Sequence, residues 1–106
     1  MFAGAHGTRI VVMHSPEGLR HLAAHPFDLA LCGHTHGGQI CLPNGRPIWL
    51  PPGELNRQYA AGRFAVGPRP HQRMIVSRGV GYGGLPLRLN APPDIVLCTV
   101  TWSEVD

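Results

Sequence analysis

The sequence has 106 residues, of which 43% are hydrophobic, and this is enough for one small domain or part of one. Its formal charge of +3 results from nine arginines, no lysine and six acidic residues. The arginines are spread from Arg9 to Arg88 and do not form the clustered patch of a nucleic-acid-binding protein. No apolar run approaches the ~20 residues that cross a bilayer, and the first residues lack a secretion-signal pattern, so we expect a water-soluble chain.

The first half of the chain has the pattern of a strand, a helix and a second strand. Residues 10–13 (IVVM) form a continuous apolar run, as expected for a strand buried on both faces. Pro16 favours the first position of a helix, and His25, which precedes a proline, favours its end. A second apolar run covers residues 29–32 (LALC). Such strand–helix–strand units place their two strands in parallel, normally with a right-handed crossover.

The second half of the chain contains shorter segments separated by glycine and proline. Asn44-Gly45 is a strong hairpin signal, with a proline on either side that suggests an exposed edge. Residues 58–66 and 71–77 are predicted to be strands joined by a loop, and residues 94–102 are predicted to form a final apolar strand.

These elements predict an α/β fold in one partial domain over residues 1–106, with one parallel βαβ unit followed by mostly antiparallel strands. Three cysteines cannot form a closed disulfide framework without a leftover, which suggests a reducing compartment. Cys32 and Cys98 lie within apolar runs and are expected to be buried as small core residues.

Three histidines follow the two predicted parallel strands. His14 comes directly after the first strand, His34 follows the second strand after one glycine, and His36 comes from the same loop. The carboxyl ends of parallel strands meet at one edge of a sheet, where open α/β sheets bind their ligands. Because neutral imidazoles are good ligands for Zn, Mn, Fe and Ni, the sequence predicts a metal site at this edge.

Two other interpretations of the same histidines remain open. Single histidines at strand ends are commonly ordinary polar surface residues. A structural zinc site built from Cys32, His34, His36 and Cys41 is the other alternative. This second alternative is weakened by the expected burial of Cys32 and by a spacing that matches none of the common zinc-finger patterns.

The sequence around these histidines resembles a known enzyme family. The segments VVMHSPE and LALCGHTHGGQI are similar to the last two metal-binding motifs of the calcineurin-like metallophosphoesterases. The later segments QYAAGRF and MIVSRGVG resemble the bacterial, membrane-associated branch of that family. The resemblance implies the C-terminal half of an α/β/β/α sandwich with a centre of two divalent metal ions (Mn, Fe, Zn or Ni). It further implies that His14 and His34 bind one metal ion and His36 the other.

The resemblance implies metal-dependent hydrolysis of phosphoesters, because two cations can polarise a phosphoryl group and activate a bridging water. However, the earlier motifs of the family, Asp-x-His, Gly-Asp and Gly-Asn-His, do not occur in this sequence. The bridging aspartate and the histidine expected to protonate the leaving group therefore have no candidate, so no catalytic residue is assigned. We expect this chain alone to have little or no activity. The rival hypothesis is a non-catalytic metal-binding or interaction domain of the same fold.

Two further residues are candidates for substrate binding. Arg78 follows a predicted strand, and its guanidinium is suited to holding a substrate phosphate. Gln39, at the end of the histidine-rich segment, is expected to line the same pocket. Residues 79–84 fit the Gly-x-Gly-x-x-Gly pattern of dinucleotide-binding proteins, but the proline-containing segment that follows cannot open a helix, so we expect a flexible loop.

Partners and localisation follow mainly from the resemblance. A phosphoester substrate is expected, and nucleic acid is not. The missing N-terminal half or a second copy of the chain is expected to cover the strand at residues 10–13. We expect a cytoplasmic protein or one peripheral to the inner membrane, with membrane contact only through a preceding N-terminal segment.

Overall fold

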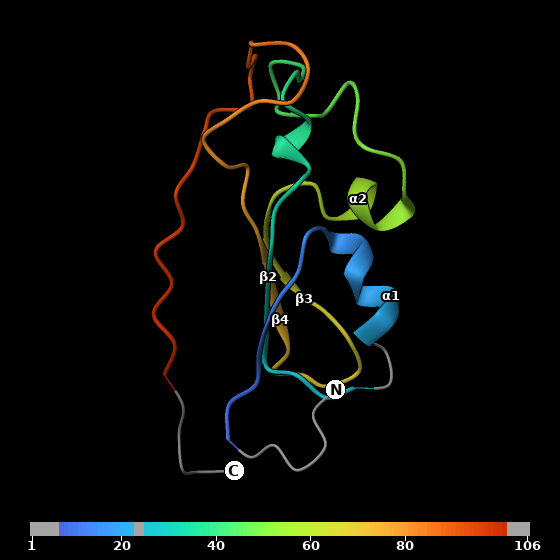
Figure 1. Ribbon diagram of the computed structural model, residues 1–106, viewed down its shortest axis with the longest axis vertical. Helices are drawn as coiled ribbons and strands as arrows, with labels where there is room; N and C mark the ends of the chain where they lie inside the picture. Colours follow the sequence, from blue (N-terminus) through green and yellow to red (C-terminus); the bar gives the residue numbers. More distant parts are fainter. Residues whose placement is uncertain (1–6, 23–24, 102–106) are drawn as a thin grey trace.

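The computed structural model describes residues 7–22 and 25–101. Its centre is one four-stranded sheet with the strand order β1-β2-β4-β3 (Figure 1). The strands are β1 (Ile10–Val12), β2 (Leu29–Cys32), β3 (Gly62–Ala65) and β4 (Arg73–Val76). The predicted α/β class is confirmed, because helical turns connect strands of a mixed sheet.

The predicted parallel unit is present. β1 pairs in parallel with β2, with Val11 opposite Ala30. The connection contains a 3-10 turn, η1 (Pro16–Gly18), and a short helix, α1 (Leu19–Leu22), which lies beside the sheet in Figure 1. Pro16 occupies the first helical position, as its fixed backbone angle favours.

The second half of the sheet differs in detail from the expectation. The predicted strand pair forms as β3 and β4 and is antiparallel. β4 also pairs in parallel with β2, so the sheet contains three parallel strands and one antiparallel strand among the described residues. Residues 54–58, part of which was predicted to be extended, form helix α2 (Glu54–Gln58). The Glu17 carboxylate accepts hydrogen bonds from the first backbone N–H groups of this helix, a contact from η1 that local sequence does not reveal.

The Asn44-Gly45 turn is present, and its flanking segments form one antiparallel bridge between Cys41 and Pro47. Gly45 has φ 87°, a left-handed value that such turns need and that glycine adopts without strain. The turn stands out from the sheet, which agrees with the exposed edge predicted from the neighbouring prolines.

The hydrophobic core lies between the sheet and α1. Ala30 and Met74 are fully buried at the centres of β2 and β4, and Leu22 and Phe27 close the core from the α1 side. Cys32 is also buried, as predicted. Among the described residues, seven buried side chains form this core cluster, and large hydrophobic side chains remain at the surface.

The predicted final strand is not formed. Of residues 94–102, the structure describes 94–101, and none of these belongs to a strand; Trp102 lies outside the described residues. The segment runs alongside the sheet in Figure 1, and a cavity of about 1120 Å³ separates it from β2 and β4. Leu97 is 95% exposed, and Cys98, which was expected to be buried, is exposed. Both expectations were wrong because an apolar run becomes a buried strand only where a neighbouring strand is available to pair with it.

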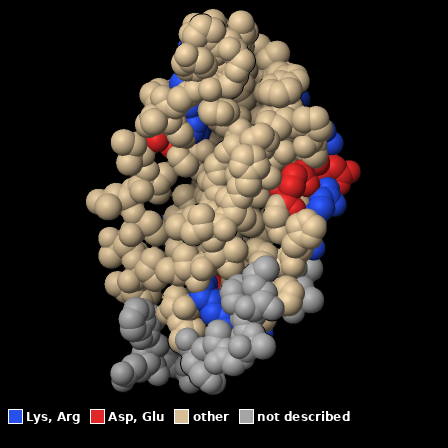
Figure 2. Space-filling model, viewed as in Figure 1, with Lys and Arg blue, Asp and Glu red and all other residues tan. Residues whose placement is uncertain are grey.

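The chain is less compact than a typical domain of the same length. The radius of gyration is 15.0 Å, whereas a compact chain of this length has about 13 Å. Figure 2 shows that most of one face carries uncharged side chains, with acidic and basic groups gathered mainly on the side of α1 and α2. Within the described residues, no helix is long and apolar enough to cross a membrane.

Candidate metal centre

His14 and His34 meet at the carboxyl ends of β1 and β2. The two ring centroids are 4.1 Å apart and the rings are tilted by 39°. The parallel pairing continues past the strands and holds the two residues together, because the backbone N–H of Gly33 donates to the carbonyl of His14 (3.3 Å). The topology thus brings together two imidazoles that are twenty positions apart in the sequence, as the strand pattern predicts.

The backbone that carries His34 and His36 is unusual. Both residues have positive φ values, 74° and 53°, which few residues other than glycine adopt. Residues held in this way cost folding free energy and concentrate at functional sites. Gly37, at φ 64°, continues the same tight path through the turn η2 (His36–Gly38). His34 and His36 are therefore carried, two positions apart, by one loop with a strained backbone.

Buried polar contacts hold this strained loop in place. The Thr35 hydroxyl, which is buried, donates to the carbonyl of Ala60 and accepts from the backbone N–H of Gly37. The Cys41 thiol donates to the carbonyl of Gly37 (3.2 Å). These bonds satisfy groups that the turn would otherwise leave unpaired in the interior, so they stabilise the histidine geometry.

The electrostatic environment of His34 favours its neutral form. Desolvation lowers the pKa of His34, and the nearby imidazoles of His14 and His36 lower it further. A neutral imidazole has a free nitrogen lone pair, which is the state that binds a metal ion. His14 and His36 thus lie near enough to His34 to disfavour its positive charge.

His36 makes a different contact from the other two histidines. Its Nδ1 lies 3.4 Å from Nη2 of Arg88. Within the part of the chain that the structure describes, no group of three histidine, cysteine, aspartate or glutamate side chains is arranged to hold a metal ion. Among the described residues, His14 and His34 are therefore a pair of candidate ligands in contact, and no carboxylate joins them in a ligand group.

The structural-zinc alternative is not supported by the cysteines. Cys32 faces the core, and burial raises the pKa of its thiol to about 11, which opposes the thiolate that zinc requires. Burial also raises the pKa of the Cys41 thiol, which is engaged with a backbone carbonyl. Neither thiol takes part in a ligand cluster among the described residues.

The two predicted substrate-binding residues both contact the loops around the histidines. The Gln39 side chain is buried; its Nε2 donates to the carbonyl of Leu85 and its Oε1 accepts from the backbone N–H of Gly83. Arg78 donates from Nε to the carbonyl of Pro92, and the same nitrogen lies 3.6 Å from Oδ2 of Asp94. Their role in substrate binding remains a prediction.

Two residues near the site were not singled out from the sequence. Asp94 was expected to begin a strand, but its Oδ1 accepts hydrogen bonds from the Ser77 hydroxyl (2.6 Å) and from the backbone N–H of Arg78 (3.0 Å). Arg88 lies in the segment after the glycine-rich loop and reaches His36. The pattern of polar and apolar residues along the sequence could not predict the contacts of Asp94 or of Arg88, because each contact joins segments more than ten positions apart.

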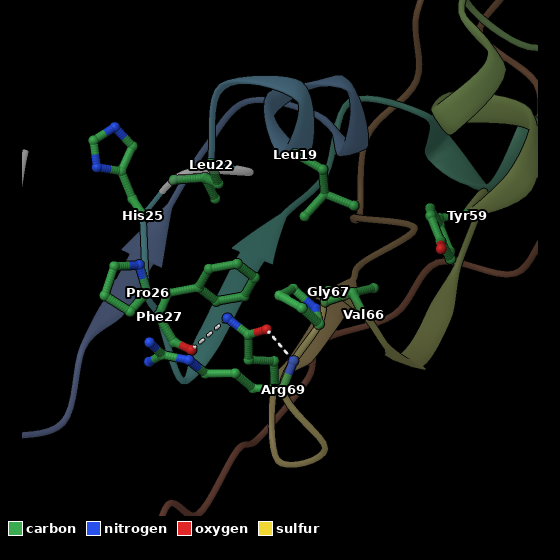
Figure 3. A pocket seen from close by; sticks show the side chains of 11 residues that line it. Leu19, Leu22, His25, Pro26, Phe27, Tyr59, Val66, Gly67 and Arg69 are labelled. Atoms are coloured by element: carbon green, nitrogen blue, oxygen red, sulfur yellow. Dashed lines mark hydrogen bonds between the residues drawn. The ribbon is translucent and has the colours of Figure 1, made fainter.

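A separate cavity of about 270 Å³ lies under α1 (Figure 3). Its lining includes residues just before β2 and β4, at the end of the sheet opposite to His14 and His34. Apolar side chains that include Leu19, Leu22 and Phe27 line it. Gln72 closes its floor by donating to the carbonyl of Phe27 and by accepting from the backbone N–H of Arg69. The cavity is thus distinct from the candidate metal centre.

The chain is similar to curated metallophosphoesterases. It is 38% identical over 91 residues to the uncharacterized metallophosphoesterase YkuE of Bacillus subtilis, covering 86% of this chain and 30% of that protein. It is 41% identical over 92 residues to the phosphodiesterase YaeI of Escherichia coli, covering 84% of this chain and 31% of the relative. A third relative is the UDP-2,3-diacylglucosamine pyrophosphatase LpxG of Chlamydia trachomatis, at 34% identity over 92 residues and 27% of its length.

No protein-family model and no solved structure matches the chain. The chain spans about a third or less of the curated relatives that it matches, which is consistent with the C-terminal half of the domain. The match covers more than four-fifths of this chain. Over more than four-fifths of its own length, the chain is therefore similar to one part of proteins named as metallophosphoesterases and related hydrolases.

Proposed function

We propose that this chain supplies the histidine side of a metal centre that hydrolyses phosphoesters. The observation that carries the proposal is the contact between His14 and His34, whose rings are 4.1 Å apart at the carboxyl ends of two parallel strands. The family relationship supports metal-dependent phosphoester hydrolysis as the general activity. Two ring nitrogens fit one side of a borderline metal ion such as Zn²⁺ or Mn²⁺.

When bound, a divalent ion would polarise the phosphoryl group and lower the pKa of a water molecule. The residues of this chain would hold the ion and keep its surroundings ordered. His14 and His34 would donate their ring nitrogens, and the Thr35 and Cys41 contacts would keep the loop in its strained form. The described residues place no carboxylate in a ligand group, so the chain alone is expected to bind metal weakly and to have no turnover.

Metal binding can be measured directly on the purified chain. Calorimetric titration with Zn²⁺ and Mn²⁺ should show binding that His14→Ala and His34→Ala each weaken at least about tenfold, because each removes one of few ligands. His21→Ala is the matched control, since His21 is exposed on α1. Equal affinity in all four proteins would contradict the proposed site.

The names of two relatives support a proposal about the class of substrate. One is named a phosphodiesterase and another a UDP-2,3-diacylglucosamine pyrophosphatase. Both reactions break a bond at a phosphorus atom that carries two substituents. We therefore propose a phosphodiester or pyrophosphate substrate for the complete centre and not a simple monoester. Bis-p-nitrophenyl phosphate, p-nitrophenyl phosphate and a nucleoside diphosphate sugar, each tested on the complete centre, would separate these classes.

A second candidate function is a metal-binding module without catalysis. The absence of a carboxylate ligand in the described part of the site favours it. The two functions differ in one measurement. If the chain is mixed with a polypeptide that spans the remaining part of the E. coli relative, phosphodiesterase activity in Mn²⁺ should appear under the catalytic proposal. Retention of metal binding with no activity in the assembled complex favours the module.

We also propose that the complementary part of a metallophosphoesterase domain is the partner of this chain. β1 lies at an edge of the sheet, and Val12 on it is 79% exposed. The relatives are about three times as long as the matched segment, so their extra length is sufficient to cover this edge. Val12→Lys should abolish capture of the complementary polypeptide and leave zinc binding unchanged. Unchanged capture by this variant would contradict the proposed contact.

A further inference from the structure

Helix α2 is capped by a side chain from a distant part of the chain. Its N-cap residue is Gly53, which has no side chain that could accept hydrogen bonds from the first turn. Oε1 of Glu17 takes this role and accepts from the backbone N–H groups of Leu55 (2.8 Å) and Asn56 (3.0 Å). The carboxylate thus joins η1, which begins two residues after His14, to a helix 38 positions away.

The backbone at Gly53 leaves the space that this carboxylate fills. A Cβ atom added to Gly53 would overlap with Oε1 of Glu17 and lie 2.5 Å from its Cδ, so only glycine fits while Glu17 is in place. Gly53 also has φ 132°, a value that other residues rarely adopt. The contact between η1 and α2 therefore depends on shape as well as on charge-assisted hydrogen bonds.

The other end of α2 is bonded to the loop that carries His34. The carbonyl of Ala60, two residues after the helix, accepts from the hydroxyl of Thr35. Thr35 is 2% exposed and stands between His34 and His36. The short segment of α2 and the two residues after it is thus bonded at its start to the segment that follows His14, and at its end to the segment that follows His34. In Figure 1, α2 lies beside the beginning of the helical segment that contains η1 and α1.

The position of the two imidazoles depends on such support from outside the strands. Past β1 and β2, their segments are joined by a backbone hydrogen bond of 3.3 Å from Gly33 to the carbonyl of His14, longer than the usual length of about 2.9–3.0 Å. Both imidazoles are on exposed residues, and His34 has a strained φ of 74°. A hydrogen-bonded helix that is held at both ends keeps the two loops at a fixed separation.

We propose that Glu17 is a positioning residue of the candidate metal centre, which acts through α2 and Thr35 to hold the His14 and His34 rings together and does not itself bind the metal ion. The inference rests on the proposed function for the use of this site. The contact between the two rings, however, can be measured without any metal, so the two proposals can fail separately.

The ring contact is measured in the metal-free whole chain by nuclear Overhauser spectroscopy. Because the ring centroids are 4.1 Å apart, the ring protons of His14 and His34 should give cross-peaks in the wild type. Glu17→Ala should lose these cross-peaks, whereas Glu17→Gln, whose amide oxygen still accepts from the N–H groups of α2, should retain them. Unchanged cross-peaks in folded Glu17→Ala, or their absence from the wild type, would overturn the proposal.

Two control variants separate the cap from other effects of the charge. Oε2 of Glu17 accepts from Nε of Arg20 (2.8 Å) at the surface, so Arg20→Met removes this ion pair and leaves Oε1 on α2. Glu54→Ala makes the same change of charge as Glu17→Ala, at an exposed residue of the first turn of α2. Both variants should keep the ring cross-peaks. Their loss in both controls would attribute the effect to charge and overturn the role of the cap.

The hydroxyl of Thr35 tests the second step, from α2 to the histidine loop. Thr35→Val removes the bond to Ala60 with little change of shape and should lose the ring cross-peaks, and Thr35→Ser, which keeps the hydroxyl, should restore them. This pair also keeps the proposal testable if Glu17→Ala does not fold. Retained cross-peaks in folded Thr35→Val would refute the path through α2.

Zinc titration links the ring contact to the metal centre. Groups that orient metal ligands are typically worth about 10–100-fold in affinity, so Glu17→Ala should bind Zn²⁺ about tenfold more weakly at a temperature where circular dichroism shows it fully folded. Arg20→Met should bind as the wild type does. Equal affinity of folded Glu17→Ala and the wild type would contradict the positioning role. If the wild type itself does not bind zinc, the proposed function fails, and the ring cross-peaks still decide the role of Glu17.

Discussion

The Asp94 carboxylate fixes the chain reversal after β4, and its charge should stabilise the folded protein. One oxygen, Oδ1, accepts from the Ser77 hydroxyl (2.6 Å) and from the backbone N–H groups of Arg78 (3.0 Å) and Gly79 (3.3 Å). The other oxygen lies 3.6 Å from Nε of Arg78. Partial burial raises the pKa of Asp94, but these hydrogen bonds and the Arg78 charge outweigh it and lower the pKa below its usual range.

The size of the effect follows from the contacts. A hydrogen bond to a charged group contributes about 1.5–3 kcal/mol and one between neutral groups about 0.5–1.5 kcal/mol. The two shorter bonds become neutral in Asp94→Asn and each then loses about 1–1.5 kcal/mol, so the free energy of unfolding should fall by about 2–3 kcal/mol at neutral pH. Asp94→Ala leaves the Ser77 hydroxyl and the Arg78 N–H without this acceptor and should cost about 2–4 kcal/mol.

Urea unfolding measured at several pH values tests the role of the charge. A carboxyl whose pKa is lower in the folded state contributes stability that is fully present above its unfolded pKa of about 4 and is lost as the pH falls through the folded pKa. The stability gap between wild type and Asp94→Asn should therefore close below pH of about 4. Glu54→Gln is the control, because Glu54 is exposed at the start of α2. A gap that is independent of pH, or absent at neutral pH, would refute the reasoning.

Three shorter predictions concern the loop, the core and the thiols. Gly37 and Gly45 both have positive φ, so replacing either by alanine should cost about 1–2 kcal/mol of stability. Gly37→Ala should lose more, because only its added Cβ would clash with a side chain, that of Arg78, at 2.5 Å. Equal losses of the two variants in urea unfolding would contradict this. Met74→Ala, at a fully buried site, should cost about 2–5 kcal/mol, and a loss below about 1 kcal/mol would show that the core is looser than described. Ellman's reagent should modify exposed Cys98 at once and Cys32 only on unfolding, because burial raises the pKa of Cys32 to about 11; equal rates for both thiols would contradict the burial.

Some features could be predicted because they depend on short-range patterns. The apolar runs at residues 10–13 and 29–32, with a proline-started turn between them, define a parallel pair, since a crossover of this length allows little else. This pairing by itself brings His14 next to His34. Sequence patterning thus determined the fold class, the pairing of β1 with β2 and the common edge of the two histidines.

Only the tertiary structure decided which apolar segments find a partner. Residues 74–76 and 95–98 are both apolar runs, yet only the first has strands on both sides, and Leu97 in the second is almost fully exposed. The contact of Arg88 with His36 also joins positions that are 52 apart, through carbonyl groups that every residue carries. Local periodicity reports how a segment can fold, whereas pairing and hydrogen bonding to backbone depend on which distant segment lies within reach.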